Sequence, residues 1–70
     1  MVDDFRDVIA IWDTPHELAT QVGVRVEAIR KWHQRDRIPP HYWQRIIEAA
    51  QAKGQALSAD DLTRIANDHS

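Results

Sequence analysis

The stretch "VGVRVEAIRKWHQRDRIPPHYW", Val22 to Trp43, lies in the basic part of a chain that is acidic overall. Residues 24–45 hold six Lys and Arg against two acids, whereas residues 1–23 hold one Arg against five acids, and residues 46–70 two bases against four. The formal charge of the whole chain is −2. A basic segment between acidic flanks creates a directed field that the total charge conceals.

Apolar residues along the chain recur at helical spacing, and alternating strand patterns are absent. Phe5, Val8, Ile9 and Trp12 follow the i, i+3, i+4, i+7 pattern of an amphipathic helix. The predicted helices cover about residues 3–12, "PHELATQV" (15–22), "RVEAIRKWHQR" (25–35) and "PHYWQRIIEAAQAK" (40–53), the last of which should bury Trp43, Ile46, Ile47 and Ala50. Ser58 is expected to cap a fifth helix, with Leu62, Ile65 and Ala66 as its apolar stripe. The sequence therefore predicts an all-α fold, a compact bundle of about five short helices in one domain, residues 1–70.

Local signals mark where these helices begin and end. Thr14 is a typical N-cap, Pro15 suits the first helical position, and Glu17 completes a capping box. Gly23 and Gly54 follow two of the apolar patterns, where a left-handed residue commonly ends a helix. Their agreement with the periodicity strengthens the predicted fold.

The residue inventory gives little support to catalysis or to a bound metal. The chain has no Cys, no glycine-rich phosphate loop and two serines, Ser58 and Ser70. The histidines are scattered, and "HE" at residues 16–17 lacks the second His of a zinc-protease motif. We therefore expect a binding protein and not an enzyme, with no cofactor, no metal and no small-molecule substrate. The absence of Cys and of a long apolar run predicts a cytoplasmic protein with no membrane partner.

The spacing between residues 15 and 34 is that of a helix-turn-helix, with a small residue, a glycine turn and later apolar anchors: Ala19, Val22, Gly23, Val24, Ile29 and Trp32. Spacing alone establishes only a helical hairpin. The segment "LATQVGVRVEAIRKW" resembles the phage Cro and lambda-repressor class of helix-turn-helix proteins. The following "RDRIPPHYW" resembles a small prophage-associated group of that class, the carph-isopro domain. The resemblance covers roughly residues 15–62.

This resemblance implies a sequence-specific, double-stranded DNA-binding transcriptional regulator of a bacterial or phage-infected cell, acting at the nucleoid and often dimeric. Its recognition helix, about residues 25–35, would enter the major groove. The residues expected to read bases are Val26, Glu27, Arg30, Lys31 and Gln34. Glu27 would accept from cytosine N4, Val26 would touch a thymine methyl, and Arg30 or Lys31 would donate to guanine. The residues expected at phosphates are Arg25, Arg35, Arg37, Arg45 and Tyr42.

Some features of the sequence also allow functions other than DNA binding. The family commonly has Ser or Thr where Arg25 stands, and Arg cannot accept the cap hydrogen bonds, which weakens this helix start by about 1 kcal/mol. The same scaffold could therefore serve as a protein–protein adaptor or antirepressor. The basic residues could also form a solvated face, although Glu27 and Asp36 are the only acids in the segment that could pair with them. The three tryptophans fit core packing better than base stacking.

A second surface is predicted near the C-terminus. Leu57, Leu62 and Ile65 could form the face of a homodimer that reads two half-sites. Equally, these three residues could close the core of a single chain.

Overall fold

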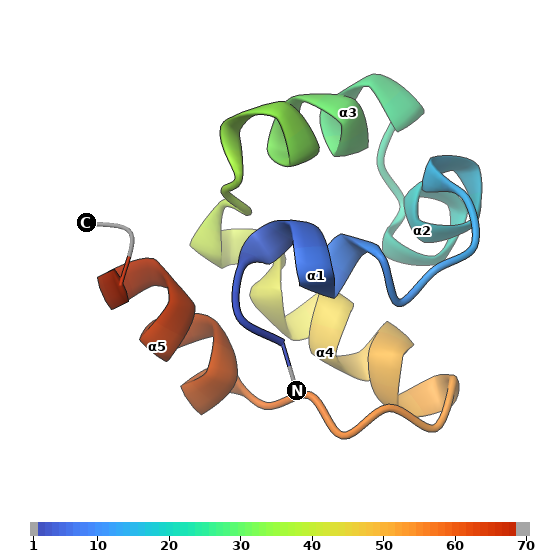
Figure 1. Cartoon of the computed structure of the whole chain (residues 1–70). Helices are drawn as coiled ribbons and strands as arrows, with labels where there is room; N and C mark the ends of the chain where they lie inside the picture. Colours follow the sequence, from blue (N-terminus) through green and yellow to red (C-terminus); the bar gives the residue numbers. More distant parts are fainter. Residues whose placement is uncertain (1, 69–70) are drawn as a thin grey trace.

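The computed structural model describes residues 2–68, which form helices joined by short loops (Figure 1). The helices are α1 (Phe5–Ile9), α2 (Pro15–Val22), α3 (Val26–Arg35), α4 (Trp43–Ala52) and α5 (Ala59–Asp68), with a 3₁₀ turn, η1 (Pro40–Tyr42), leading into α4. No strand occurs among residues 2–68. The predicted all-α bundle of about five short helices is confirmed.

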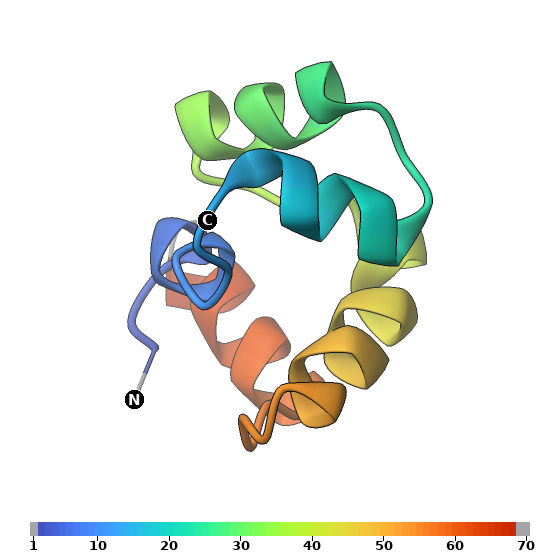
Figure 2. The same ribbon diagram turned by 90° about the vertical axis from the view of Figure 1, so that its right-hand side faces the viewer.

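The helices pack around one apolar cluster to which all five contribute. α3 packs on α1 and α2, α2 packs on α4, and α4 packs on α5. In two views at right angles, α3 lies along the upper edge of the molecule (Figures 1 and 2). One long side of α3 is therefore left to solvent.

α1 is shorter than the predicted helix over residues 3–12. Asp4 is its N-cap, and one Asp4 carboxylate oxygen accepts from the Asp7 N–H at 2.7 Å. After Ile9 the chain tightens, and Trp12 N–H donates to the Ile9 carbonyl at 3.2 Å, a bond between residues three apart. The predicted apolar side is nevertheless correct, because Phe5, Val8, Ile9 and Trp12 are all buried.

α2 begins and ends where its sequence signals predict. The Thr14 hydroxyl accepts from the Glu17 N–H at 3.2 Å, and Gly23 ends the helix at φ 82°. The Glu17 carboxylate reaches away to Lys53, with 2.7 Å between Oε1 and Nζ. Only the Thr14 half of the predicted capping box is therefore formed, because the ion pair has taken the Glu17 side chain.

α4 begins later than predicted, since residues 40–42 form the 3₁₀ turn. Trp43 is half-buried, not buried as its spacing predicts, and its indole N–H donates to the Ile38 carbonyl at 2.8 Å. Gly54 ends α4 at φ 83°. The bonds of Gly54 to Gln51 and of Gln55 to Ala50 are both 3.0 Å long, as in a Schellman motif.

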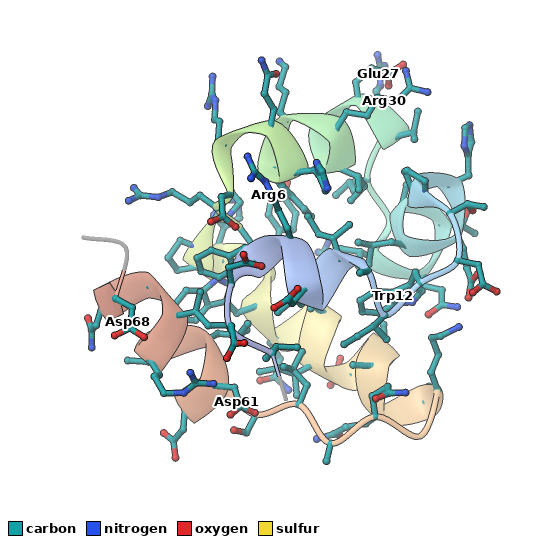
Figure 3. The ribbon with its side chains drawn as sticks, in the orientation of Figure 1. Arg6, Trp12, Glu27, Arg30, Asp61 and Asp68 are labelled. Carbon is teal, nitrogen blue, oxygen red and sulfur yellow. The ribbon has the colours of Figure 1, made fainter. Side chains whose placement is uncertain are left out.

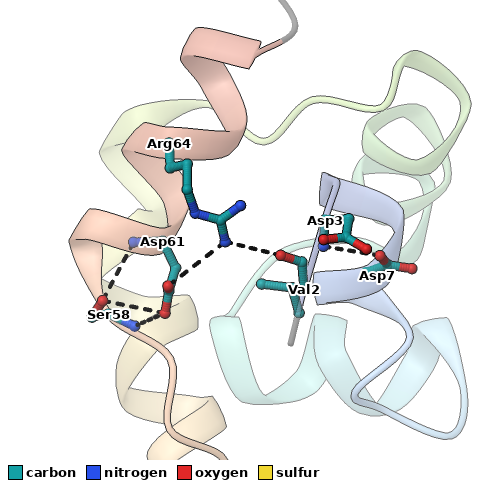
Figure 4. Close-up of polar contacts among 6 residues, drawn as sticks. All are labelled: Val2, Asp3, Asp7, Ser58, Asp61 and Arg64. Carbon is teal, nitrogen blue, oxygen red and sulfur yellow. Dashed lines mark hydrogen bonds and ion pairs between the residues drawn. The ribbon is translucent and has the colours of Figure 1, made fainter.

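α5 has a full capping box at its start (Figure 4). The Ser58 hydroxyl accepts from the Asp61 N–H at 3.3 Å, and the Asp61 carboxylate accepts from the Ser58 N–H at 3.1 Å. Arg64 on the same helix donates to the Val2 carbonyl at 2.9 Å, which ties α5 to the N-terminal segment (Figure 4).

The prediction of a dimer face at α5 and the residue before its cap is wrong, because its three residues are not at the surface. Leu57, Leu62 and Ile65 are 3%, 0% and 0% exposed and belong to the core of a single chain. The sequence left both uses open, and folding selects the core because a small domain needs all of its large apolar side chains to exclude water.

Candidate nucleic-acid interface

α3 buries one side and exposes the other. Ile29 and Trp32 are 0% and 6% exposed and root the helix in the core. Glu27 and Arg30 project from the outer side, away from the other helices (Figure 3). The helix starts at Arg25, whose side chain makes no capping hydrogen bond, as its sequence predicts.

A groove runs along one flank of α3, between the turn that joins α2 to α3 and the segment after α3. Its lining residues are Gly23, Val24, Arg25, Glu27, Ala28, Lys31, Trp32, Arg35, Arg37, Pro39 and Tyr42. The turn at Gly23 and Val24 lines the groove beside the start of α3, and Arg37 and Pro39 line it beyond the end of α3.

Positive charge dominates this groove. Arg25, Lys31, Arg35 and Arg37 line it, and Glu27 is the one acid among its lining residues. All four bases are exposed, and within residues 2–68 no carboxylate forms an ion pair with any of them. The groove can therefore bind an anionic partner without first breaking an internal ion pair.

The predicted base-reading residues do not share one surface. Glu27 and Lys31 line the groove, whereas Arg30 and Gln34 lie on the other flank of α3, beside a small apolar depression formed with Ile9, Pro15, Ile29 and His33. Val26 is half-buried and packs against the core. The residues predicted to read bases are therefore divided between the groove and the other depression beside α3.

The predicted phosphate-binding residues are brought together with one exception. Arg25, Arg35, Arg37 and Tyr42 line the groove, but Arg45 does not. The Arg45 guanidinium donates to the Val22 carbonyl at 3.4 Å and lies 5.9 Å from the centroid of the Tyr42 ring. It supports the wall of the groove from behind.

Tyr42 is held by its aromatic neighbours. Its ring centroid is 5.2 Å from that of Trp32 and 4.2 Å from that of His41, and Arg45 lies over the ring as well. A ring covered in this way is a poor stacking platform for an unpaired base. The geometry therefore favours Tyr42 as a fixed wall whose hydroxyl group can meet a phosphate.

Arg6 also contacts the end of α3, although no sequence pattern predicts this contact. Its Nε donates to the His33 carbonyl at 2.8 Å and its Nη2 donates to the Gln34 carbonyl at 3.3 Å, both at the end of α3. These partners are 27 and 28 residues away, so no local pattern could reveal them. The available signal was that Arg6 is the one base among the first 23 residues.

Charges away from α3 are mostly acidic or paired. Asp60, Asp61 and Asp68 lie on α5. Figure 3 shows Asp61 and Asp68 far from Glu27 and Arg30 on the outer side of α3. The hydrogen bond to Glu17, aided by the charges of Glu17 and Asp13, raises the pKa of Lys53 above its ordinary value, although desolvation opposes the shift. The groove-lining bases thus belong to α3 and its flanking segments, whereas Asp60, Asp61 and Asp68 belong to α5.

Within the described part of the chain, no three His, Cys, Asp or Glu side chains gather closely enough to hold a metal ion. No helix among residues 2–68 is both long and apolar enough to cross a membrane.

No protein-family model matches the sequence, and no match was found among curated proteins or solved structures.

Proposed function

We propose that the protein binds double-stranded DNA through α3 and the adjoining groove, as a sequence-specific transcriptional regulator of the phage type. One observation carries the proposal. Arg25, Lys31, Arg35 and Arg37 come together in one groove, without ion pairs among residues 2–68, in a chain whose net charge is −2. Phosphates are the partners that such a group of exposed cations fits best.

The proposed docking places the start of α3 in the major groove, with α2 and α3 acting as a helix-turn-helix. Arg25, Arg35 and Arg37 would bind phosphates, while Glu27 and Lys31 would face base edges. Glu27 would add selectivity, because a carboxylate near the DNA is repelled unless it accepts a hydrogen bond from a base such as cytosine. DNA binding would place the protein at the nucleoid.

A single domain of this size makes few contacts. We propose that two chains bind neighbouring half-sites one helical turn apart, so that one DNA site receives the contacts of two recognition helices. Leu57, Leu62 and Ile65 take no part, because they are buried within each chain. Sedimentation with one-site and two-site duplexes would show whether two chains occupy one DNA.

The test of the function is binding of the purified protein to labelled random-sequence duplexes and to genomic upstream fragments, measured by fluorescence anisotropy. We expect affinity to fall steeply between about 50 and about 200 mM salt, with a log–log slope approaching about −2.7 for the three phosphates that Arg25, Arg35 and Arg37 neutralise. We also expect tight selection of one upstream fragment. Weak binding to every duplex at the lowest salt would overturn the proposal.

An acidic protein partner is the second candidate, which corresponds to an adaptor or antirepressor. Half-buried Val24, Ala28 and Pro39 line the same groove and would suit apolar side chains of a peptide. Tight binding of an acidic amphipathic peptide, with a shallow salt dependence and no duplex binding, would support this candidate.

A further inference from the structure

Arg6 joins α1 to the end of α3, the helix that carries the groove. Its side chain lies between the two helices (Figure 3). Arg6 does not line the groove, and its Nε and Nη2 donate to the carbonyls of His33 and Gln34. A direct phosphate contact would compete with these bonds.

These carbonyls belong to the last turn of α3, where the intrahelical N–H donors run out. The negative end of the helix dipole lies in the same place, so a cation is favourable there. The Asp36 N–H also reaches the His33 carbonyl, but at 3.3 Å, whereas the Arg6 Nε bond is 2.8 Å. Arg6 therefore provides the shorter hydrogen bond at this carbonyl.

Asp36 completes the connection from the other direction. Its Oδ1 accepts from the backbone N–H of Arg6 at 3.1 Å, one of the donors left without a partner in the first turn of α1. Each helix thus supplies a group that the end of the other lacks. We call the three bonds from Arg6 to His33, Gln34 and Asp36 the Arg6 clasp.

The clasp lies at a turn with an unusual backbone. Asp36 has φ 52°, in the left-handed region that glycine adopts most easily. A non-glycine residue stays there when its surroundings hold it. The Arg37 N–H then donates back to the Trp32 carbonyl at 3.0 Å. The direction of the chain after α3 therefore depends on this turn.

Arg35 and Arg37 flank Asp36 on either side, and both line the groove. We infer that Arg6 is a positioning residue for DNA binding, which acts by fixing the end of α3 so that Arg35 and Arg37 face phosphate. This inference rests on the proposed function.

The test compares Arg6→Ala with Arg64→Ala in the full chain. Arg64 is a matched control, because it is also an exposed arginine that donates to a backbone carbonyl, that of Val2, but on α5. Both variants remove one positive charge. For Arg6→Ala we expect duplex affinity to fall about tenfold at about 100 mM salt, with the slope shallower by about 0.9, because the contacts of Arg35 and Arg37 weaken together by the equivalent of about one phosphate. Base preference should be unchanged, and Arg64→Ala should bind within about twofold of the natural chain.

A double-mutant cycle separates positioning from general weakening. If Arg6 acts through Arg35 and Arg37, adding Arg6→Ala to Arg35→Ala with Arg37→Ala should lower affinity by less than about twofold. An undiminished tenfold loss in that background would overturn the inference. So would equal effects of Arg6→Ala and Arg64→Ala.

Hydrogen exchange supplies a readout without DNA. We expect Arg6→Ala to speed exchange of the Arg37 amide, which the clasp protects. Faster exchange with unchanged DNA affinity would overturn the inference and leave the proposed function standing, whereas a natural chain that binds no DNA overturns both. Should the alanine variant fail to fold, Arg6→Lys replaces it, since lysine keeps the charge but lacks the planar fork. A shallower slope then supports the inference, and an unchanged slope overturns it.

Discussion

α3 and α5 are both ten-residue amphipathic helices, yet they differ in how their first turns are capped and in whether their charges are paired. α5 starts with a reciprocal capping box between Ser58 and Asp61, and Asp61 also lies 3.8 Å from Arg64. α3 starts at Arg25, with no side-chain cap, and its groove-lining bases have no ion pairs within residues 2–68. Local interactions stabilise the start of α5, whereas α3 leaves its start uncapped and its groove-lining bases available. This difference is expected when one helix serves the fold and the other serves a partner.

The largest expected effect tests the structural role of α5. Leu62 is 0% exposed, so Leu62→Ala should lower the free energy of unfolding by about 2–5 kcal/mol through lost apolar contacts and a cavity. A domain of this size has little stability to spare, so much of the variant should be unfolded in urea or thermal melts followed by circular dichroism. Exposed Thr63→Ala on the same helix is the control. A Leu62→Ala melt like that of the natural chain would show that α5 does not close the core.

The next effect tests the binding role of α3. Arg30→Ala with Lys31→Ala should keep its helical content and bind its preferred DNA about 5- to 150-fold more weakly, if the contact of Lys31 with a base edge is lost. Lys53→Ala with Arg64→Ala changes net charge equally and should have little effect on DNA affinity. Because Lys31 lines the groove and Arg30 does not, Lys31→Ala alone should account for most of the loss. Equal DNA affinity in the two double variants would refute the site.

Exchanging the two kinds of helix start should sharpen the comparison. Arg25→Ser supplies the missing cap of α3 and should raise the free energy of unfolding by about 0.5–1 kcal/mol. It should also weaken DNA binding up to about eightfold at about 100 mM salt, through one lost phosphate interaction. Ser58→Ala, which removes the cap of α5, should reduce stability by about 1 kcal/mol and leave affinity unchanged. Chemical denaturation and anisotropy measure the two quantities. A stabilised Arg25→Ser that binds DNA at full strength would remove Arg25 from the interface.

The smallest effect concerns a paired base outside α3. The hydrogen bond to Glu17 raises the folded-state pKa of Lys53 above its ordinary value. The stabilisation is therefore fully present below the unfolded pKa and is lost as pH rises through the folded pKa. Melting temperatures between about pH 9 and about pH 12 should fall slightly more for the natural chain than for Glu17→Gln. Parallel curves would show that the pair adds no stability, as is common at exposed sites.

Helix starts and stops could be predicted from the sequence because their causes lie within a few residues. Thr14, Gly23, Gly54 and Ser58 all act as predicted, and so does the uncapped Arg25. Predictions that needed distant partners succeeded less well. The Glu17 side chain was expected to bond back to the N-cap residue Thr14, but it forms an ion pair with Lys53, 36 positions away.

The candidate site shows the same division. The basic segment and its exposed side follow from composition and helical periodicity. Periodicity alone could not show that Lys31 lines the groove whereas Arg30 lines a different depression, because that depends on which elements stand beside the helix. Arg45 illustrates this dependence, since its guanidinium is directed to the Val22 carbonyl by the packing of α2 against α4.

The sequence by itself determined an all-α chain, most of the helix limits and a basic segment between acidic flanks, because caps, turns and amphipathic spacing act within one or two helical turns. Only the tertiary structure decided that Leu57, Leu62 and Ile65 belong to the core. It also decided that four bases share one groove and that Arg6 holds the end of α3. These outcomes arise from packing between residues that lie far apart in the chain, whose burial and hydrogen bonding no local pattern encodes.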